Sequence, residues 1–315
     1  MRCPRLRTLV LPAECLDGVD YALPNLKVFA PDRRLMREAP VLNPAWLLAG
    51  SPRLRSLSGV CLTRRDLLAR LGACGSLVRM EDLHLDVTRL PNPLTLRLSG
   101  QVEFLDLHIE RRDRSRAGRR TLDLHVEAPG LMNLFLENDA ELPFTRIRIR
   151  LGNCPALVHL DVRSEIPISL QVDEGGCTAL QPRWLYAECL EGASMLDLLA
   201  GHGARLHTIA VSPQAVDDWP KLMEALSRLP RLTDLDLDVT GSTCDISLNC
   251  PQLQSLGLAG VHAGAKAVLA CPLLKELRGI AYPSRQLELA MPAPNLAPPS
   301  SPTIDNELLD AEEDE

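Results

Sequence analysis

The chain has 315 residues, of which 46% are hydrophobic, 3% aromatic and 24% charged, and its net charge is −7. It carries neither a signal peptide nor an apolar run long enough to cross a bilayer, and its ten cysteines lack the spacing of zinc sites, so we expect neither a membrane protein nor a secreted disulfide scaffold. Seven acids lie in residues 305–315, which leaves 34 acidic and 34 basic residues elsewhere and excludes the basic footprint of a nucleic-acid-binding protein.

A short phrase, Pro-x-Leu-x-x-Leu or a close variant, recurs from Pro4 to the region of Pro272. From this phrase and its weaker copies we assign one apolar residue to the start of each predicted strand. These residues are 20 to 28 positions apart, which is the period of leucine-rich repeats. The series consists of Leu9, Phe29, Leu57, Leu83, Leu107, Leu134, Leu160, Leu185, Ile209, Leu235, Leu256 and Leu277. The sequence therefore predicts about 12 stacked repeat units, called rungs below, each contributing one parallel strand.

The segments between these strands differ along the chain. Helical spacing predicts a helix over 64–71, alternating residues predict short outer strands over 94–98, 122–126, 146–151 and 166–172, and helical spacing returns over 193–200 and 216–229. The predicted fold class is an α/β repeat: a leucine-rich-repeat solenoid with a parallel concave sheet and a convex side of mixed helical and short β segments. The predicted repeat domain spans 1–290, and 291–315 is expected to form a disordered Pro-rich and then acidic tail.

The Cys-Pro-x-Leu anchors, together with the segment Val126-Glu127-Ala128-Pro129-Gly130-Leu131-Met132-Asn133-Leu134-Phe135-Leu136-Glu137, resemble the repeats of plant-type F-box/leucine-rich-repeat proteins. The resemblance covers the chain up to about residue 290. It implies a substrate receptor of a cullin-type ubiquitin ligase. We find no F-box, and Met1-Arg2-Cys3-Pro4 opens inside a repeat phrase, so we expect an F-box to precede Met1 in the natural protein.

Catalytic motifs such as GxSxG, a phosphate loop or HExxH do not occur, so we expect no enzyme, no cofactor and no small-molecule substrate. Two alternatives remain open. One is a scaffold or receptor fragment unrelated to ubiquitin. The other is a metal-dependent enzyme, with an ion held by His84, Asp86, His108 and Glu110 on adjacent strands.

Two groups of residues favour structural explanations. Some cysteines precede the Pro-Leu phrases, such as Cys154, Cys250 and Cys271, and we expect their side chains to be buried in the core as small hydrophobic groups. Because such thiols stay reduced, we expect the protein to be cytoplasmic or nuclear. The run Arg111–Arg120 is the densest basic segment and is expected to form a solvated loop, with contact to phosphate or acidic partners as the alternative.

The residues that flank the inward apolar positions of each strand should face outward on the concave surface. Over the seven rungs from Leu83 to Leu235, ten of 21 such positions are Asp or Glu, whereas only Arg163 is basic. We therefore expect this face to bind another protein through a basic segment, with aromatic anchors among the acids. The predicted partner-binding residues are Asp82, His84, Asp86, Asp106, His108, Glu110, Phe135, Glu137, Asp161, Trp184, Tyr186, Glu188, Asp234, Asp236 and Asp238.

Overall fold

The computed structural model describes most of the predicted repeat region. The described residues are 5–11, 23–31, 45–87, 89–110, 121–138, 144–164, 166–173, 182–187, 190–212, 218–240, 242, 245–261, 266–279 and 287–289. The basic run 111–120, Glu188 and the tail 291–315 lie outside these residues, so the expectations about them stay predictions.

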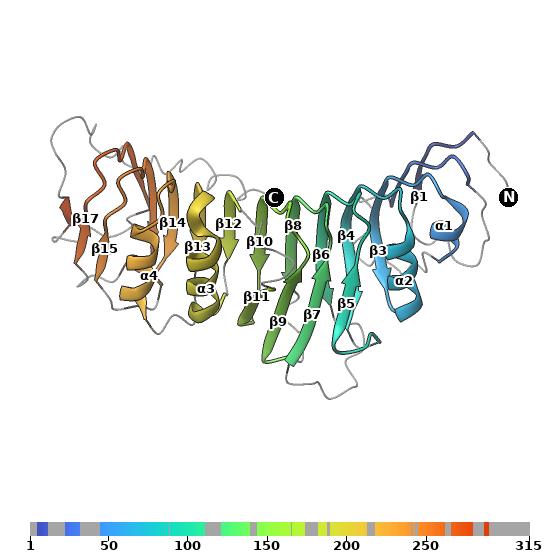
Figure 1. Cartoon of the computed structure of the whole chain (residues 1–315), viewed down its shortest axis with the longest axis horizontal. Helices are drawn as coiled ribbons and strands as arrows, with labels where there is room; N and C mark the ends of the chain where they lie inside the picture. Colours follow the sequence, from blue (N-terminus) through green and yellow to red (C-terminus); the bar gives the residue numbers. More distant parts are fainter. Residues whose placement is uncertain are drawn as a thin grey trace, which may run out of the picture.

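The largest element in the described part of the chain is a 12-stranded sheet in which every strand pairs in parallel with the next (Figure 1). Its strands follow chain order: β1 (Thr8–Leu11), β2 (Val28–Pro31), β3 (Ser56–Leu62), β4 (Arg79–Asp86), β6 (Phe104–Glu110), β8 (Asn133–Asn138), β10 (His159–Arg163), β12 (Trp184–Ala187), β13 (Thr208–Val211), β14 (Asp234–Asp238), β16 (Ser255–Ala259) and β18 (Glu276–Arg278). The protein is thus an α/β structure built on one long parallel sheet, an arrangement compatible with a repeat solenoid.

The connections between these strands carry a second row of elements. This row contains α1 (Ala45–Gly50), α2 (Arg65–Ala73), β5 (Leu94–Arg97), β7 (Thr121–Glu127), β9 (Arg146–Gly152), β11 (Ile168–Val172), α3 (Gly192–His202), the 3-10 turn η3 (Gly203–Arg205), α4 (Trp219–Ser227), β15 (Ile246–Leu248), β17 (Ala267–Leu269) and β19 (Leu287–Leu289). The strands β5, β7, β9 and β11 form a four-stranded parallel sheet, and β15, β17 and β19 form a three-stranded one. Contacts of α2 with β5, α3 with β11 and α4 with β15 join the helices to these small sheets.

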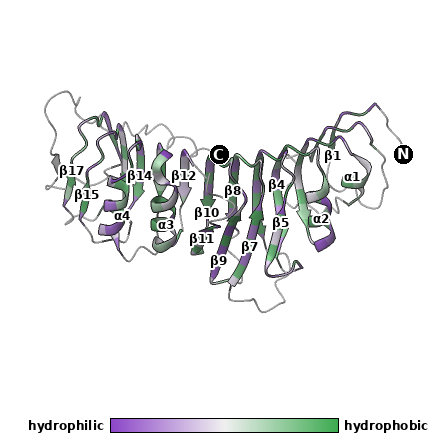
Figure 2. Cartoon of the chain, in the orientation of Figure 1, coloured by the Kyte–Doolittle hydropathy of each residue, from purple (hydrophilic) through white to green (hydrophobic). Residues whose placement is uncertain are grey.

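The core lies between the large sheet and the second row, because apolar residues alternate with polar ones along the facing strands. In β6 and β7 every second residue is buried, and Figure 2 shows hydrophobic and hydrophilic residues interspersed along the strands. Leu105 and Leu107 of β6 and Leu122 and Leu124 of β7 are at most 2% exposed. Leu160, whose inward orientation the repeat phrase predicts, is 1% exposed.

The recurring Pro-x-Leu phrase forms a tight turn before several strands of the large sheet. The N–H of Leu157 donates to the carbonyl of Cys154 at 3.3 Å, and the N–H of Leu253 donates to the carbonyl of Cys250 at 3.2 Å. This bond joins the first and fourth residues of a β-turn, and proline at the second position supplies the φ that the turn needs. Cys154, Cys250 and Cys271 are buried free thiols, as the sequence predicts.

All three predicted helices and all four predicted outer strands are present, as α2, α3, α4, β5, β7, β9 and β11. The short α1 and the strands β15, β17 and β19 were not among the predicted elements. The predicted strand-opening residues are wrong in two rungs, because Met80 and Leu105, and not Leu83 and Leu107, align with Leu57 and Leu134.

The cause of this shift is a β-bulge. The pairing of β4 with β6 slips between Met80 and Leu83, where Asp82 has a φ of +48°, and Gly59 on the neighbouring β3 has a φ of +63°. A bulge inserts an unpaired residue and redirects the side chains beside it. An extra residue of this kind breaks the spacing from which the register was predicted.

Candidate functional site

Parallel register arranges the outward side chains of the large sheet in rows. One row runs through Asn133, His159, Trp184, Thr208 and Asp234 on β8 to β14, and a second runs from Asp106 through Phe135, Asp161, Tyr186 and Ala210 to Asp236. A third row places His84, His108, Glu137 and Arg163 side by side. Most of the predicted partner-binding residues therefore share one face of the sheet.

Two of them are not exposed there as expected. Asp86 is buried, and its Oδ2 lies 3.6 Å from Nε of Arg89. Asp161 is also buried, beneath Arg163, whose Nε and Nη2 donate to its two oxygens at 3.1 and 3.0 Å. A buried carboxylate requires such partners because desolvation of an unpaired charge is costly. The expectation that Asp86 and Asp161 are solvent-exposed is therefore wrong.

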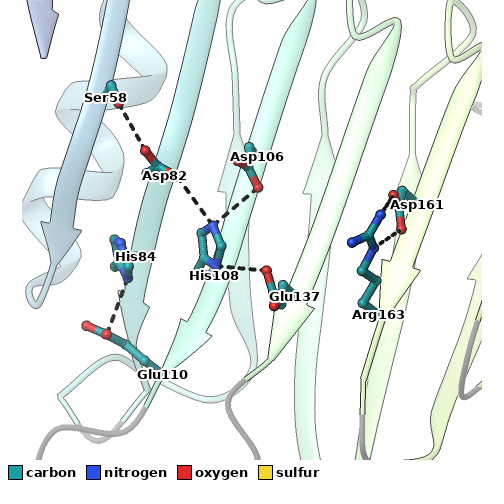
Figure 3. A network of polar contacts seen from close by, with 9 residues as sticks. All are labelled: Ser58, Asp82, His84, Asp106, His108, Glu110, Glu137, Asp161 and Arg163. Carbon is teal, nitrogen blue, oxygen red and sulfur yellow. Dashed lines mark hydrogen bonds and ion pairs between the residues drawn. The ribbon is translucent and has the colours of Figure 1, made fainter. Parts of the chain in front are cut away.

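The densest polar group on this face surrounds His108, and we call Ser58, Asp82, Asp106, His108 and Glu137 the His108 cluster (Figure 3). Nε2 of His108 lies 3.4 Å from Oδ1 of Asp106 and 3.7 Å from Oδ1 of Asp82, while its Nδ1 lies 3.4 Å from Oε2 of Glu137. The hydroxyl of Ser58 donates to Oδ2 of Asp82 at 3.4 Å. The bulge in β4 thus brings Asp82 to the same imidazole as Asp106 of the neighbouring strand.

Charges in this cluster alter its titration. The carboxylate of Asp106 raises the pKa of His108 through hydrogen bonding and charge, assisted by Glu137 and Asp82, although partial burial opposes the change. Burial tends to raise the pKa of Asp106, but His108, the backbone N–H of Asp82 and the charge of His84 together lower it. Both shifts favour an ionised carboxylate beside a protonated imidazole.

A second polar group adjoins the first. His84 stacks on His108 with the ring centroids 5.0 Å apart, and its Nδ1 lies 3.3 Å from Oε2 of Glu110. The thiol of the buried Cys61, next to His84 in the register, donates to Oε1 of the same carboxylate at 3.3 Å. This thiol contact was not predicted, because the alignment of β3 with β4 depends on the bulge.

The proposed metal set of His84, Asp86, His108 and Glu110 does not assemble. Asp86 turns toward Arg89, and His84 pairs with Glu110 separately from His108. Within the described ranges, the one group of three metal-ligating side chains with all ligand atoms within 4.8 Å of one another is Asp82, Asp106 and His108. The sequence placed His108 correctly but missed the convergence of the two aspartates on it.

Aromatic side chains occupy the middle of the face. Trp184 and Tyr186 of β12 stack with centroids 6.2 Å apart, and the rings of His159 and Trp184 are T-shaped with centroids 6.1 Å apart. The guanidinium of Arg163 lies 5.0 Å from the ring centre of Tyr186. Contacts of this kind restrict the rotation of the rings.

A second aromatic pair was not predicted, because the predicted register aligned Leu107 and not Leu105 with Leu134. Phe104 lies 5.2 Å from Phe135 between ring centroids, and the guanidinium of Arg79 sits 4.0 Å from the centre of the Phe104 ring. Alignment on Leu105 within Val102-Glu103-Phe104-Leu105 would have placed both Phe104 and Arg79 on this face. Arg163 is therefore not the sole basic residue there, because Arg79 shares the first row.

Near the C-terminal end of the large sheet, a pocket of about 360 Å³ is lined by Tyr186 on one side and by Asp236 and Asp238 on the other, with Ala210 and Ser212 among the lining residues. Gly257 leaves room for the carboxylate of Asp236, since a Cβ there would lie 1.9 Å from its Oδ1. Nη2 of Arg278 lies 3.3 Å from that same oxygen.

Asp238 is held by the polar groups around it. Partial burial tends to raise its pKa, but hydrogen bonds from the hydroxyl and backbone N–H of Thr240 and from the hydroxyl of Ser212 outweigh burial and lower it. The carboxylate therefore stays ionised in the pocket at neutral pH.

Comparisons with protein-family models and with curated proteins found no match to this chain. Among the helices that the structure describes, none is both long and apolar enough to span a bilayer.

Proposed function

We propose that this chain is a leucine-rich-repeat module that binds a basic segment of another protein on the outward face of its 12-stranded sheet. The strand order supports the repeat class, because each strand pairs in parallel with the strand of the next rung. The tight turns before the strands support it further, because the same phrase builds the same bond in several rungs. Free buried thiols fit a reducing compartment such as the cytoplasm or nucleus.

One observation carries the binding proposal: a trough on β13 between aromatic and acidic walls. Tyr186 of β12 forms one side and Asp236 and Asp238 of β14 form the other, while Ala210 of β13 and Ser212, which follows β13 directly, have side chains too small to fill the gap. Neighbouring strands lie about 4.8 Å apart, so the walls stand roughly 10 Å from each other. This width fits an extended Lys or Arg side chain that contacts the Tyr186 ring on one side and, on the other, Asp238 and Asp236, the latter shared with Arg278.

The specific form of the proposal is substrate recognition for a cullin-type ubiquitin ligase, and its support is the resemblance of the Cys-Pro-x-Leu repeats to plant-type F-box/leucine-rich-repeat proteins. This form requires an adaptor-binding segment beyond the repeats. Co-purification of the natural full-length protein with a cullin adaptor tests it separately from the binding of a basic segment.

Stopped-flow fluorescence with labelled peptides tests the binding face. The probe is an unstructured peptide of repeated Arg, Ser and Gly, and its counterpart carries Glu in place of Arg. We expect the Arg peptide alone to bind, with an association rate that falls as salt rises. The variant Asp234→Lys, Asp236→Lys, Asp238→Lys should bind the Arg peptide more slowly and with weaker salt dependence.

A matched control separates this local effect from net charge. Asp66→Lys, Asp197→Lys, Glu224→Lys changes the charge equally at exposed positions of α2, α3 and α4, and it should behave like the unmodified protein. Equal slowing of both triple variants would show that the trough is not the binding site.

A further inference from the structure

The geometry points to a second site on this face: we propose that Asp82, Asp106 and His108 bind one divalent transition-metal ion of the Zn²⁺ type. The three side chains come from two adjacent strands, β4 and β6. Their ligand atoms, one from each residue, all lie within 4.8 Å of one another. Unlike a patch of carboxylates alone, the group includes an imidazole nitrogen directed at both aspartates.

The two distances from the imidazole nitrogen to the aspartate oxygens are close to those within a metal site. Nε2 of His108 lies 3.4 Å from Oδ1 of Asp106 and 3.7 Å from Oδ1 of Asp82. Both distances exceed the roughly 2.7–3.2 Å of an ordinary N–H···O hydrogen bond. Zinc binds nitrogen and carboxylate oxygen at about 2.0–2.2 Å, so the ligands of a tetrahedral ion stand about 3.3–3.6 Å apart. Small side-chain adjustments would complete three corners of such a tetrahedron.

Neighbouring groups hold each ligand from behind. The hydroxyl of Ser58 donates to Oδ2 of Asp82 and leaves its Oδ1 facing the imidazole. Oε2 of Glu137 lies 3.4 Å from Nδ1 of His108, so it can accept the Nδ1 proton when a metal ion displaces the proton from Nε2. The backbone N–H of Asp82 bonds the carboxylate of Asp106. Metal ligands in proteins are oriented by outer partners of this kind, a carboxylate behind a histidine above all.

The fourth corner of the tetrahedron is open. The three residues line a pocket of about 210 Å³ together with Phe135, Leu136, Glu137, Asp161 and Arg163. Side chains of Asp82, Asp106 and His108 are each about a quarter exposed, so an ion can reach them from solvent. The one arginine of this lining, Arg163, directs two donors at Asp161. The open position can hold a water molecule or a donor atom from a partner.

The ligand types select the metal class. An imidazole favours zinc and the other first-row transition metals, whereas calcium and magnesium prefer sites made of oxygen alone. Two carboxylates offset the charge of a divalent ion, and Glu137 adds a third negative charge next to the imidazole. We therefore expect Zn²⁺ and Co²⁺ to bind more tightly than Ca²⁺ or Mg²⁺.

Isothermal titration of the chelator-treated protein with Zn²⁺ tests the site without any partner protein. We expect one ion per chain, and a Co²⁺ complex with the intense visible absorption of tetrahedral coordination. Asp106→Asn and His108→Gln should each abolish both signals, and Glu137→Ala should weaken Zn²⁺ binding roughly 10–100-fold. Asp234→Asn and His159→Gln, which change the same residue types elsewhere on the sheet, should bind Zn²⁺ like the unmodified protein.

Two results would overturn the proposal. One is the absence of saturable Zn²⁺ binding at one ion per chain by a protein that melts cooperatively. The other is equal binding by the His108→Gln and His159→Gln proteins. Neither result bears on the trough between Tyr186 and Asp236, because the peptide experiment uses no metal.

Discussion

Arg163 holds the buried carboxylate of Asp161 in a two-point contact, with Nε on Oδ1 and Nη2 on Oδ2. The two residues lie two positions apart on β10, so their side chains leave the same face of the strand. Arg163 also reaches across to the Tyr186 ring. One guanidinium thus covers an acid of its own strand and supports an aromatic of the next.

Removal of the Arg163 side chain should destabilise the fold. Arg163→Ala leaves the Asp161 carboxylate with less of the hydrogen bonding that offsets its burial, and we expect a loss of about 1–3 kcal/mol in the free energy of unfolding. Urea titration of Arg163→Ala, Asp161→Asn and the double variant measures the coupling. Strictly additive effects of the two substitutions would contradict the pairing.

Leu160 provides a test of the core. It is fully packed between Leu134 and Leu185 in the register of the large sheet, so Leu160→Ala should cost roughly 2–5 kcal/mol of unfolding free energy. Met132→Ala is the matched control, because Met132 is an apolar residue of the preceding rung that is 42% exposed. A melting curve equally shifted by both variants would reject the burial pattern of β10.

Two glycines of successive turns offer a sharper comparison. A Cβ on Gly130 would lie 2.1 Å from the carbonyl oxygen of Gly100, a backbone atom that cannot move aside cheaply, whereas a Cβ on Gly100 meets nothing within 4 Å. We expect Gly130→Ala to lower the unfolding free energy by about 1–3 kcal/mol through this overlap. Gly100→Ala should leave it nearly unchanged, and calorimetric melting of the two proteins compares them directly.

These turns show how much of the fold the sequence could predict. A phrase such as Pro155-Ala156-Leu157 marks both a turn and the first buried side chain after it, so the inward leucines and the period follow from local chemistry. The helix α2 and the strand β9 also follow from periodicity within their own residues. Short elements such as β15 have too few residues for any period to emerge.

The candidate site was less predictable because it depends on positions across strands. Side-chain alternation places His84 and His108 on one face, but the bulge at Asp82 decides which carboxylates reach which imidazole. The positive φ of Asp82 is not signalled by the sequence, because the residue there is not a glycine. The burial of Asp161 could not be predicted for a similar reason. It depends on the side-chain conformation of Arg163, which folds over the carboxylate, and strand alternation does not predict that conformation.

Asp238 should give the structure an acid-sensitive contact. Its pKa in the folded chain lies below the usual value of 3.8, so ionisation of this group favours the folded state. That contribution is fully present above pH 3.8 and is lost as the pH falls through the lowered pKa. Thr240→Val removes one hydroxyl donor and should raise the pKa of Asp238, as measured by carboxyl carbon NMR. Thr95→Val on β5 should leave this titration unchanged, and an identical Asp238 curve in the Thr240→Val protein would contradict the assigned cause.

Trp184 should dominate the affinity for a basic peptide. Its ring is partly exposed, and the contacts with Tyr186 and His159 restrict its rotamers before binding, so little entropy remains to be lost. Truncation of a central aromatic anchor typically costs at least about 2 kcal/mol, which corresponds to a roughly 30-fold higher Kd for the Arg peptide in Trp184→Ala. Tyr186→Phe keeps the neighbouring ring and should bind nearly as tightly as the unmodified protein. If Trp184→Ala unfolds at the same urea concentration as the unmodified protein and its Kd is also unchanged, the peptide does not contact the Trp184 ring.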